Sequence, residues 1–405
     1  MIATANGFEL ATEKMREFAL AYTEKFSISL MGGLSGIALS AAHVGRHLDP
    51  SYQQLSETML TEIVNRLNEG KLRTSSLHTF CSGLAGVMYT LDHLEAEGLA
   101  PAYLPETTYA TLVDVLMKEC RKDFAKRNTD YLHGPLGVFL TFLKRWPNPV
   151  VEPAMDEIID TYVAQLVTDD RGSRIYNSVI MEQHPEEYSF GLAHGLAGHQ
   201  LIFAEALRRG YRPALMRTLL QDIGRYMESY RRPENPEEQW QVFYPTFVVE
   251  NDPEHWEKER PGAYVSRVGW CYGDINVALA QLKVGKVIGD EEQYARGRRL
   301  SDHLATRLDP ANAQINVNPY FCHGAIGTSY MFAAIARETG SAACGHAHRH
   351  WLDHAETLMH TPEHTTEPVT RTLSMLEGLP GVSLGMLGSL PEANLPASDF
   401  FLLNL

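Results

Sequence analysis

Two kinds of apolar segment alternate along the chain. One kind is almost free of charge, as in Thr328–Ala336, and the other carries charges on one face only. A helix that is apolar all round is buried, whereas a helix with one charged face lies at the surface. The alternation therefore predicts an all-α fold with an inner and an outer helical layer. The amphipathic segments that we assign to the outer layer are Glu13–Phe26, Gln54–Leu67, Met155–Leu166, Met216–Tyr230 and Glu292–Leu308.

A Gly-x-x-Gly-like turn precedes the charge-free segments and recurs seven times. The first glycines are separated by 50, 51, 61, 78, 51 and 54 residues. In the fifth copy Asn276 replaces the second glycine, and asparagine tolerates turn geometry better than most residues. Repeats of this length indicate stacked units, here one inner and one outer helix each. The first glycines are Gly33, Gly83, Gly134, Gly195, Gly273, Gly324 and Gly378.

Seven inner and seven outer helices predict either an open solenoid or a closed ring. The ends of a solenoid need polar capping repeats, and neither the first nor the last repeat is obviously polar. We therefore predict a double-layer α/α toroid that comprises residues 1–405 as one domain. All seven turns should then lie at one end of the inner ring, which we call the mouth.

The 78-residue interval between the fourth and fifth turns is longer than the others. Within it, Gln241–Val249 is rich in β-branched and aromatic residues, which favour strands over helices. We predict a small β-containing insertion over residues 232–264, beside the mouth.

Composition excludes several classes of protein. The net charge of −15 without a Lys/Arg-rich run argues against a nucleic-acid partner. The N-terminal residues lack the pattern of a signal peptide, and no stretch of 18 uncharged apolar residues predicts a transmembrane segment. Five cysteines in 405 residues do not make a disulfide framework. We therefore expect the protein in the reducing cytoplasm.

Two cysteines occupy matching positions in consecutive repeats. Cys271 and Cys322 each lie two residues before a first glycine, and His323 follows Cys322 directly. The shared register predicts that the three side chains are neighbours at the mouth. Two thiols and an imidazole are a ligand set suited to Zn²⁺, with a fourth position left open for chemistry. The alternative is that two buried cysteines and a core histidine coincide by chance.

His194 directly precedes the first glycine of the fourth turn and should face the same centre. As a fourth ligand it would make the metal site closed and structural. As a general acid or base it would act beside an open metal site. The third possibility is a core histidine.

Four further residues near the turns are candidates with weaker signals. Asp130 could orient an imidazole, bind a peptide amine, or be a solvated loop residue. His133 shares the register of His194 and ranks below it. Arg267 could stabilise an anion or lie at the surface, and Tyr272 could hydrogen-bond to a reacting group.

Other motifs are assigned no function. Cys81 shares the register of Cys271, but no adjacent repeat supplies a partner, so we expect a core residue. The histidine-rich run 344–354 should lie on a solvated outer helix. The glycine-rich turns match neither a P-loop nor a dinucleotide-binding fingerprint.

Three motifs together resemble a known family. Gly-Trp-Cys-Tyr-Gly at 269–273, Phe-Cys-His-Gly at 321–324 and Gly-Leu-Ala-His-Gly at 191–195 occur on seven Gly-x-x-Gly repeats. This combination resembles the lanthipeptide synthetase component C (LanC-like) family, and in particular the standalone cyclases of class I systems. The resemblance implies an α/α toroid and a zinc ion bound by Cys271, Cys322 and His323. It also implies catalytic roles for His194 and Asp130, with Arg267 and Tyr272 as active-site neighbours.

The resemblance further implies a reaction and partners. A peptide cysteine would add to a dehydroalanine or dehydrobutyrine of the same dehydrated precursor peptide, closing a (methyl)lanthionine ring. A separate dehydratase would act first, and a complex with it and an exporter would attach the enzyme peripherally to the membrane. The 232–264 interruption is similar to a subdomain thought to engage the peptide.

Three alternatives stay open at this point. Eukaryotic-type relatives with the same zinc motif are implicated in adding glutathione to dehydroamino acids in proteins. A non-enzymatic scaffold would hold a closed four-ligand zinc. A toroidal glycosidase would need a pair of carboxylates at the mouth, where this sequence has thiols and imidazoles.

Overall fold

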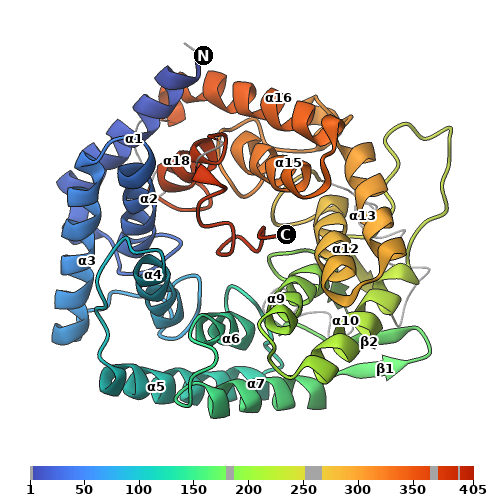
Figure 1. Ribbon diagram of the computed structural model, residues 1–405, viewed down its shortest axis with the longest axis horizontal. Coiled ribbons are helices and arrows are strands. Elements are labelled where there is room, and N and C mark those ends of the chain that lie inside the picture. Colours follow the sequence, from blue (N-terminus) through green and yellow to red (C-terminus); the bar gives the residue numbers. More distant parts are fainter. Residues whose placement is uncertain (1–2, 179–186, 251–266, 365–372, 391–392) are drawn as a thin grey trace.

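The computed structural model describes residues 3–178, 187–250, 267–364, 373–390 and 393–405. In these residues, two concentric rings of helices surround a common centre (Figure 1). The predicted all-α toroid, with seven inner and seven outer helices in the described part of the chain, is confirmed. The inner helices are α2 (Leu34–His47), α4 (Leu84–Ala96), α6 (Pro135–Leu143), α9 (Leu196–Arg208), α12 (Asp274–Ile288), α15 (Ala325–Thr339) and α18 (Leu379–Leu387).

The outer ring alternates with the inner one along the chain. Short elements, η1 (Thr23–Lys25), α14 (Pro310–Ala313) and η2 (Pro362–His364), lie in the connections. The outer helices are α1 (Ala3–Tyr22), α3 (Ser51–Glu69), α5 (Glu106–Ala125), α7 (Glu152–Ala164), α10 (Pro213–Glu228), α13 (Glu291–Leu304) and α16 (Ala342–Met359).

Burial explains which helices are inner and which are outer. Every residue of α6 and of α18 is buried, as expected for helices without a charged face. In α10 only one stripe is buried, made of Met216, Leu219, Leu220, Ile223, Tyr226 and Met227. The predicted outer segments match observed helices, although α1 begins well before Glu13 and α13 ends before the predicted Leu308. At the start of α13, the Asp290 side chain caps the helix by accepting a hydrogen bond from Gln293 N.

Backbone hydrogen bonds join successive turns around the mouth. The residue two before each first glycine, which we call the rim residue, accepts a hydrogen bond from the preceding turn in six of seven cases among the described residues. The bond from Met375 N to Met31 O, 2.7 Å, joins the seventh turn to the first and closes the ring. The other five are Met31 N to Cys81 O (2.9 Å), Cys81 N to Leu132 O (2.8 Å), Ala193 N to Cys271 O (3.3 Å), Trp270 N to Cys322 O (2.8 Å) and Cys322 N to Leu376 O (2.9 Å).

The second glycine of the turns allows this close stacking. A Cβ atom at Gly137 would meet the Tyr131 carbonyl of its own turn and lie 2.6 Å from Cβ of Phe80 in the preceding turn. A Cβ atom at Gly86 would likewise lie 2.8 Å from Cβ of Leu30. Real Cβ atoms do not approach so closely, so the turns can stack at this distance only with glycine at these positions.

The fifth turn is built differently, as the replacement of its second glycine by Asn276 requires. Its first glycine, Gly273, has φ 124°, where the other first glycines are extended. The Asn276 side chain accepts a hydrogen bond from Leu192 N (3.2 Å) and donates one to Trp270 O (3.1 Å). The substitution therefore preserves the link between the fourth and fifth turns.

Two small antiparallel sheets interrupt the helices. Strands β1 (Val167–Asp169) and β2 (Gly172–Arg174) form a hairpin that the sequence analysis did not predict. Strand β4 (Phe247–Val249) pairs with β3 (Glu187–Ser189), so only the last three residues of the predicted Gln241–Val249 segment form a strand. Residues 251–264 of the predicted insertion lie outside the described residues, and the insertion as a unit remains a prediction. None of the described helices is long and apolar enough to cross a membrane.

The segment 393–405 crosses the middle of the inner ring (Figure 1). Its aromatic residues Phe400 and Phe401 are fully buried. Nothing in the repeat pattern predicted this central position, because the segment follows the last inner helix and belongs to no repeat.

We predict opposite effects for two Gly→Ala substitutions. Gly137→Ala should lower the free energy of unfolding by about 1–3 kcal/mol or more, because the new methyl group meets fixed atoms of two turns. Gly345→Ala, in the outer helix α16 with only Arg349 Nη1 nearby at 3.8 Å, should raise it by about 0.5–1 kcal/mol. Urea unfolding measures both, and equal effects of the two substitutions would contradict this account of the turns.

Candidate metal centre and active site

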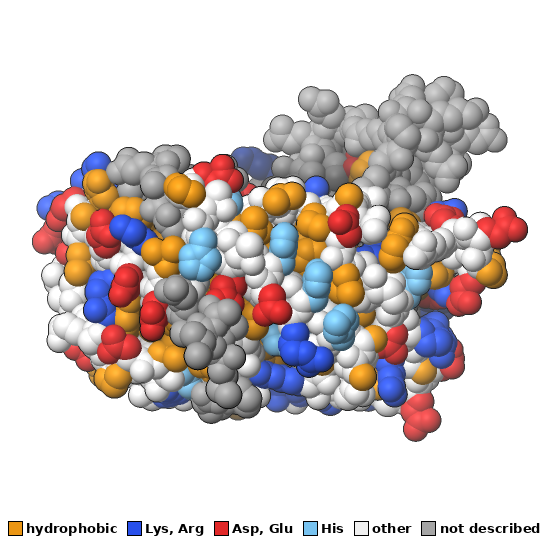
Figure 2. All heavy atoms as spheres, turned by 90° about the horizontal axis from the view of Figure 1, so that it is seen from above, with side chains coloured by type: hydrophobic (Ala, Val, Ile, Leu, Met, Phe, Trp, Pro, Cys, Tyr) orange, Lys and Arg blue, Asp and Glu red, His pale blue; other side chains and the backbone are white. Residues whose placement is uncertain are grey.

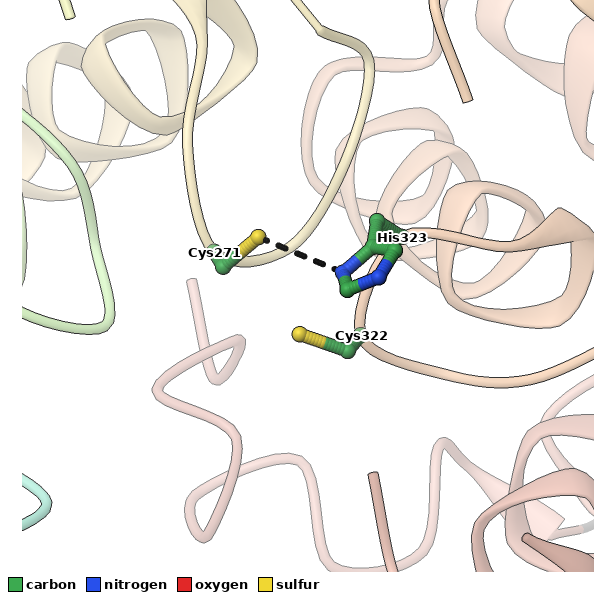
Figure 3. A group of neighbouring side chains, drawn as sticks. All are labelled: Cys271, Cys322 and His323. Atoms are coloured by element: carbon green, nitrogen blue, oxygen red, sulfur yellow. Dashed lines mark hydrogen bonds between the residues drawn. The ribbon is translucent and has the colours of Figure 1, made fainter. Parts of the chain in front are cut away.

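Three potential metal ligands converge at the mouth, as the shared register predicted. The ligand atoms of Cys271, Cys322 and His323 all lie within 4.8 Å of one another. Figure 3 shows the three side chains pointing toward one another, with Cys271 Sγ 3.7 Å from His323 Nδ1. Cys271 is buried, and Cys322 is partly exposed.

The pKa values of the two thiols are shifted in opposite directions. A hydrogen bond between them lowers the pKa of Cys271 well below its usual range, against the opposing effect of burial. The same hydrogen bond raises the pKa of Cys322 well above its usual range. The Arg267 guanidinium lowers both pKa values, so the local charge favours a thiolate here.

The donor set suits zinc. It is the one group of three or more such ligands that comes together in the described ranges. Two sulfurs and an imidazole nitrogen match the soft ligands that zinc accepts, and three protein ligands leave one position for a substrate. On the far side of the imidazole, His323 Nε2 lies 3.9 Å from Oε1 of Glu377, where a carboxylate commonly orients a metal-binding histidine.

A histidine–carboxylate pair lies at the neighbouring turns. His194 Nδ1 is 2.9 Å from Oδ2 of Asp130. Asp130 is fully buried, and it also accepts hydrogen bonds from Asn177 Nδ2 (2.7 Å) and from His133 N (2.7 Å). Three donors therefore fix this carboxylate. His194 does not belong to the group of three metal ligands.

The pKa of His194 is raised and the pKa of Asp130 is lowered, because the attraction between the two groups outweighs the effect of burial on each. Burial lowers the pKa of His194, but the Asp130 carboxylate raises it by more, so the net shift is upward. Burial raises the pKa of Asp130, but His194 and the other donors lower it by more. The pair is therefore stabilised as imidazolium and carboxylate. The pKa of His133 is lowered by burial, and its ring stacks on that of His194 with centroids 5.6 Å apart.

Arg267 and Tyr272 border the same site. The tilted ring of Tyr272 lies 6.2 Å from that of His194, and burial and the Cys271 charge raise the pKa of its hydroxyl. The Arg267 side chain packs on Gly269 beside His323, and its Nε donates to Gln314 O at 3.1 Å. Arg267 is thus partly buried, and not a free surface residue.

The polar side chains of the site occupy the position directly before the first glycine in successive turns. From the third turn to the seventh they are His133, His194, Tyr272, His323 and Glu377, whereas the first two turns have Gly32 and Ser82. The polar groups thus form an arc over five consecutive turns.

The sequence analysis missed two residues of this arrangement. The register could have identified Glu377, because it occupies the pre-glycine position of the seventh turn. Asn177 lies in a connection after β2, outside the repeat, so no spacing pointed to it.

Two other cysteine predictions have different outcomes. The prediction that Cys81 is a core residue is wrong in part, because it is partly exposed at the rim. Burial and the Asp130 charge raise its pKa to about 12, which leaves it a neutral thiol. Cys344 lies on the buried side of the outer helix α16, and histidines gather on the molecular face that includes this helix (Figure 2). The histidine-rich run therefore lies away from the mouth, as predicted.

The ion pair predicts a pH-dependent contribution to stability. The raised pKa of His194 stabilises the fold at low pH, and this contribution is lost as pH rises through the folded-state pKa. The lowered pKa of Asp130 stabilises it above the unfolded-state value and is lost as pH falls. The free energy of unfolding of wild type should therefore exceed that of Asp130→Asn by the largest amount between about pH 4 and 6.5. Urea unfolding across pH measures the difference, and a difference that grows steadily above pH 7 would contradict the assignment.

Comparisons with known proteins agree with the geometry. The chain is 24% identical over 324 residues to the nisin biosynthesis protein NisC of Lactococcus lactis subsp. lactis, covering 74% of this chain and 72% of that protein. The solved structure of a nisin cyclase superposes with a TM-score of 0.76 at 20% identity, covering 97% of this chain and 96% of that chain. The model of the lanthionine synthetase C-like proteins matches residues 24–402. The chain therefore belongs to the lanthionine synthetase C-like family.

Proposed function

We propose that the protein is a zinc-dependent lanthipeptide cyclase. It would form (methyl)lanthionine rings by adding cysteine thiols to dehydroalanine or dehydrobutyrine of the same peptide. The observation that carries the proposal is the convergence of Cys271, Cys322 and His323 beside the His194–Asp130 pair. Family membership and the likeness to a protein called nisin cyclase support it.

Cys271, Cys322 and His323 would hold the zinc ion. When bound, zinc would keep a substrate thiol at the open position as a thiolate at neutral pH, although a free thiol has a pKa of about 8.5. Because His194 is engaged by Asp130 and lies outside the ligand group, it leaves the fourth position to the substrate.

The addition needs an acid. The substrate sulfur bonds to the β-carbon of the dehydroamino acid, the π electrons move toward the carbonyl as an enolate, and the α-carbon then takes up a proton. His194 is the proposed proton donor. Its Nδ1 proton faces Asp130, so the transferable proton is at Nε2, and the raised pKa favours the protonated ring.

Two neighbours would stabilise the developing enolate. Arg267 carries a permanent positive charge next to His323. The Tyr272 hydroxyl stays protonated because its pKa is raised, so it can donate a hydrogen bond. Asp130 would set the orientation and charge of His194 without contacting the peptide, because it is fully buried.

The substrate and partners follow from the proposed reaction. A dehydrated precursor peptide must reach the mouth, and a separate dehydratase must produce its dehydroamino acids. An exporter would receive the product, and a complex with it would be the route to peripheral membrane attachment. The insertion at 232–264 is the proposed contact for the peptide.

The first test combines zinc content with thiol alkylation. Wild type should bind one zinc ion per chain, Cys271→Ala should lose it, and His194→Ala should keep it. Each enzyme is incubated with a synthetic peptide that contains one dehydroalanine and one cysteine, and then with an alkylating reagent. At the time when wild type has just protected the peptide cysteine fully, mass spectrometry should show it still alkylated with both variants. His194→Ala should cyclise the peptide about 10²–10⁴-fold more slowly.

The other outcomes identify the alternatives. Zinc loss in His194→Ala would indicate a closed structural site. A glutathione adduct on a cysteine-free dehydroalanine peptide, without cyclisation of the first peptide, would indicate a glutathione-adding enzyme.

The acid role predicts the pH–rate profile. Because the protonated form of His194 is active, the rate should fall as pH rises through its pKa. Asp130→Asn removes the charge that raises this pKa while burial remains, so the alkaline limb should move to lower pH. Ser82→Ala, at the pre-glycine position of a turn without ionisable groups there, is the control and should leave the limb in place. An unchanged limb in Asp130→Asn would exclude His194 as the acid.

A further inference from the structure

The central segment 396–405 lies directly beneath the candidate site. Trp270, the neighbour of Cys271, is fully buried and donates a hydrogen bond from Nε1 to the Phe401 carbonyl at 2.9 Å. Phe321, the neighbour of Cys322, stacks on Phe401 with centroids 3.6 Å apart and planes 11° from parallel. The same residue of the segment thus contacts the neighbours of both zinc-binding thiols.

A second contact reaches the acid side of the site. Tyr131, the neighbour of Asp130, is fully buried and donates its hydroxyl hydrogen to the Phe400 carbonyl at 2.6 Å. The Phe400 ring also stacks near that of Phe80, with centroids 5.8 Å apart. Two adjacent residues, Phe400 and Phe401, therefore contact the turns of both halves of the site.

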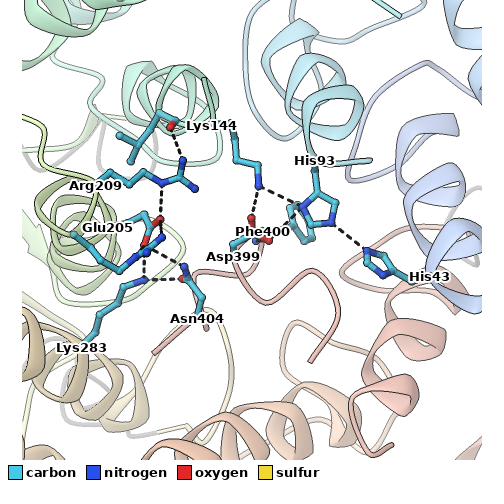
Figure 4. A network of polar contacts seen from close by, with 11 residues as sticks. His43, His93, Lys144, Glu205, Arg209, Lys283, Asp399, Phe400 and Asn404 are labelled. Atoms are coloured by element: carbon cyan, nitrogen blue, oxygen red, sulfur yellow. Dashed lines mark hydrogen bonds and ion pairs between the residues drawn. The ribbon is translucent and has the colours of Figure 1, made fainter. Parts of the chain in front are cut away.

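Polar anchors tie the segment to the inner helices (Figure 4). Asp399 Oδ2 lies 2.6 Å from Lys144 Nζ, and Asp399 Oδ1 lies 3.5 Å from His93 Nδ1. The Asn404 side chain accepts from Lys283 Nζ at 2.6 Å and donates to Glu205 Oε2 at 3.2 Å. The anchors come from the C-terminal parts of α4, α9 and α12 and from Lys144 directly after α6, so four repeats fix the position of Phe400 and Phe401.

The backbone around these contacts is strained. Non-glycine residues rarely have positive φ, and such strain persists only where the surroundings hold it. Four non-glycine residues within 394–405 have positive φ: Asn394 (44°), Leu395 (54°), Ala397 (57°) and Leu402 (60°). The surroundings therefore hold this part of the backbone in one conformation.

We propose that segment 396–405 is a positioning element of the active site. Through Phe401 it sets the relative position of the two thiol-bearing turns, and through Phe400 it sets that of the Asp130-bearing turn. The inference rests on the proposed function in so far as the positioned thiols bind zinc. None of the residues in the segment contacts the substrate in this role.

The test compares two equally buried phenylalanines in the full chain. Phe401→Ala removes the contact with Phe321, whereas Phe203→Ala in α9 removes a contact that points outward, to Tyr162 of α7. Both variants and wild type are stripped of metal and compared in melting temperature, in zinc affinity against a competing chelator, and in capture of phenylarsine oxide by Cys271 and Cys322. This arsenical binds two thiols at once, so it reports their spacing without zinc.

Phe401→Ala should weaken zinc binding about 10–100-fold and slow capture of the arsenical. Phe203→Ala should lower the melting temperature but leave both other measurements at the wild-type level. If Phe401→Ala fails to fold, Phe401→Leu keeps the apolar volume, loses the ring stack and should still weaken zinc binding. Wild-type zinc affinity and arsenical capture in the Phe401 variant, or equal losses in both variants, would overturn the proposal. A wild type that binds no zinc would refute the proposed function, while the arsenical capture would still decide the positioning role.

The acid side has its own test. Tyr131→Phe deletes only the hydroxyl that contacts Phe400, so zinc affinity should be unchanged. The cyclisation rate should fall, and the alkaline limb of its pH profile should move. A Tyr131→Phe enzyme with the rate and pH profile of wild type would restrict the positioning role to the thiols.

Discussion

The close stacking of the seven glycine turns is the constraint on which this structure depends. Six of the seven rim carbonyls, among the described residues, accept a hydrogen bond from the preceding turn, and at Gly86 and Gly137 a side chain would collide with that turn. The stacking brings residues 51 positions apart in the sequence, such as Cys271 and Cys322, to one point. It thereby converts a repeat in the sequence into a ring of side chains that face a common mouth.

In the described part of the chain, one junction between turns lacks such a backbone bond. It is the junction between the third and fourth turns, which holds Asp130 and His194. Between the third and fourth turns, the Ala193 carbonyl accepts no bond from the rim residue Leu132, and the side-chain pair makes the connection instead. Asn177 reinforces it by donating to both Asp130 Oδ2 and the His194 carbonyl. The site thus uses a gap in the ring to place an ionised pair, and its three donors offset the cost of burying the Asp130 charge.

Residues that belong to the repeat were predictable, and those outside it were not. Register alone predicted that Cys271, Cys322 and His323 would meet, and the same rule applied to the seventh turn would have found Glu377. Asn177, the β1–β2 hairpin and Phe401 obey no period, since they lie in connections or after the last inner helix. Cys81 packs against the core, as predicted, but it is not fully buried, because the rim is partly open to solvent at this position. Roles in catalysis could be assigned only by resemblance.

The central position of Phe400 and Phe401 has a consequence for biosynthesis. A ribosome synthesises a chain from the N-terminus towards the C-terminus, so all seven turns are made before the segment that lies beneath them. The bond between Met375 and Met31 also spans nearly the whole chain, and contacts of such long sequence separation form late because their loop-closure entropy is large. A nascent chain would therefore carry all three candidate ligands and yet lack the contacts of Phe400 and Phe401 with the turns that bear them. Cys271, Cys322 and His323 would therefore take up their final positions only after Phe400 and Phe401 have been synthesised, when the other inner-ring helices can already have formed.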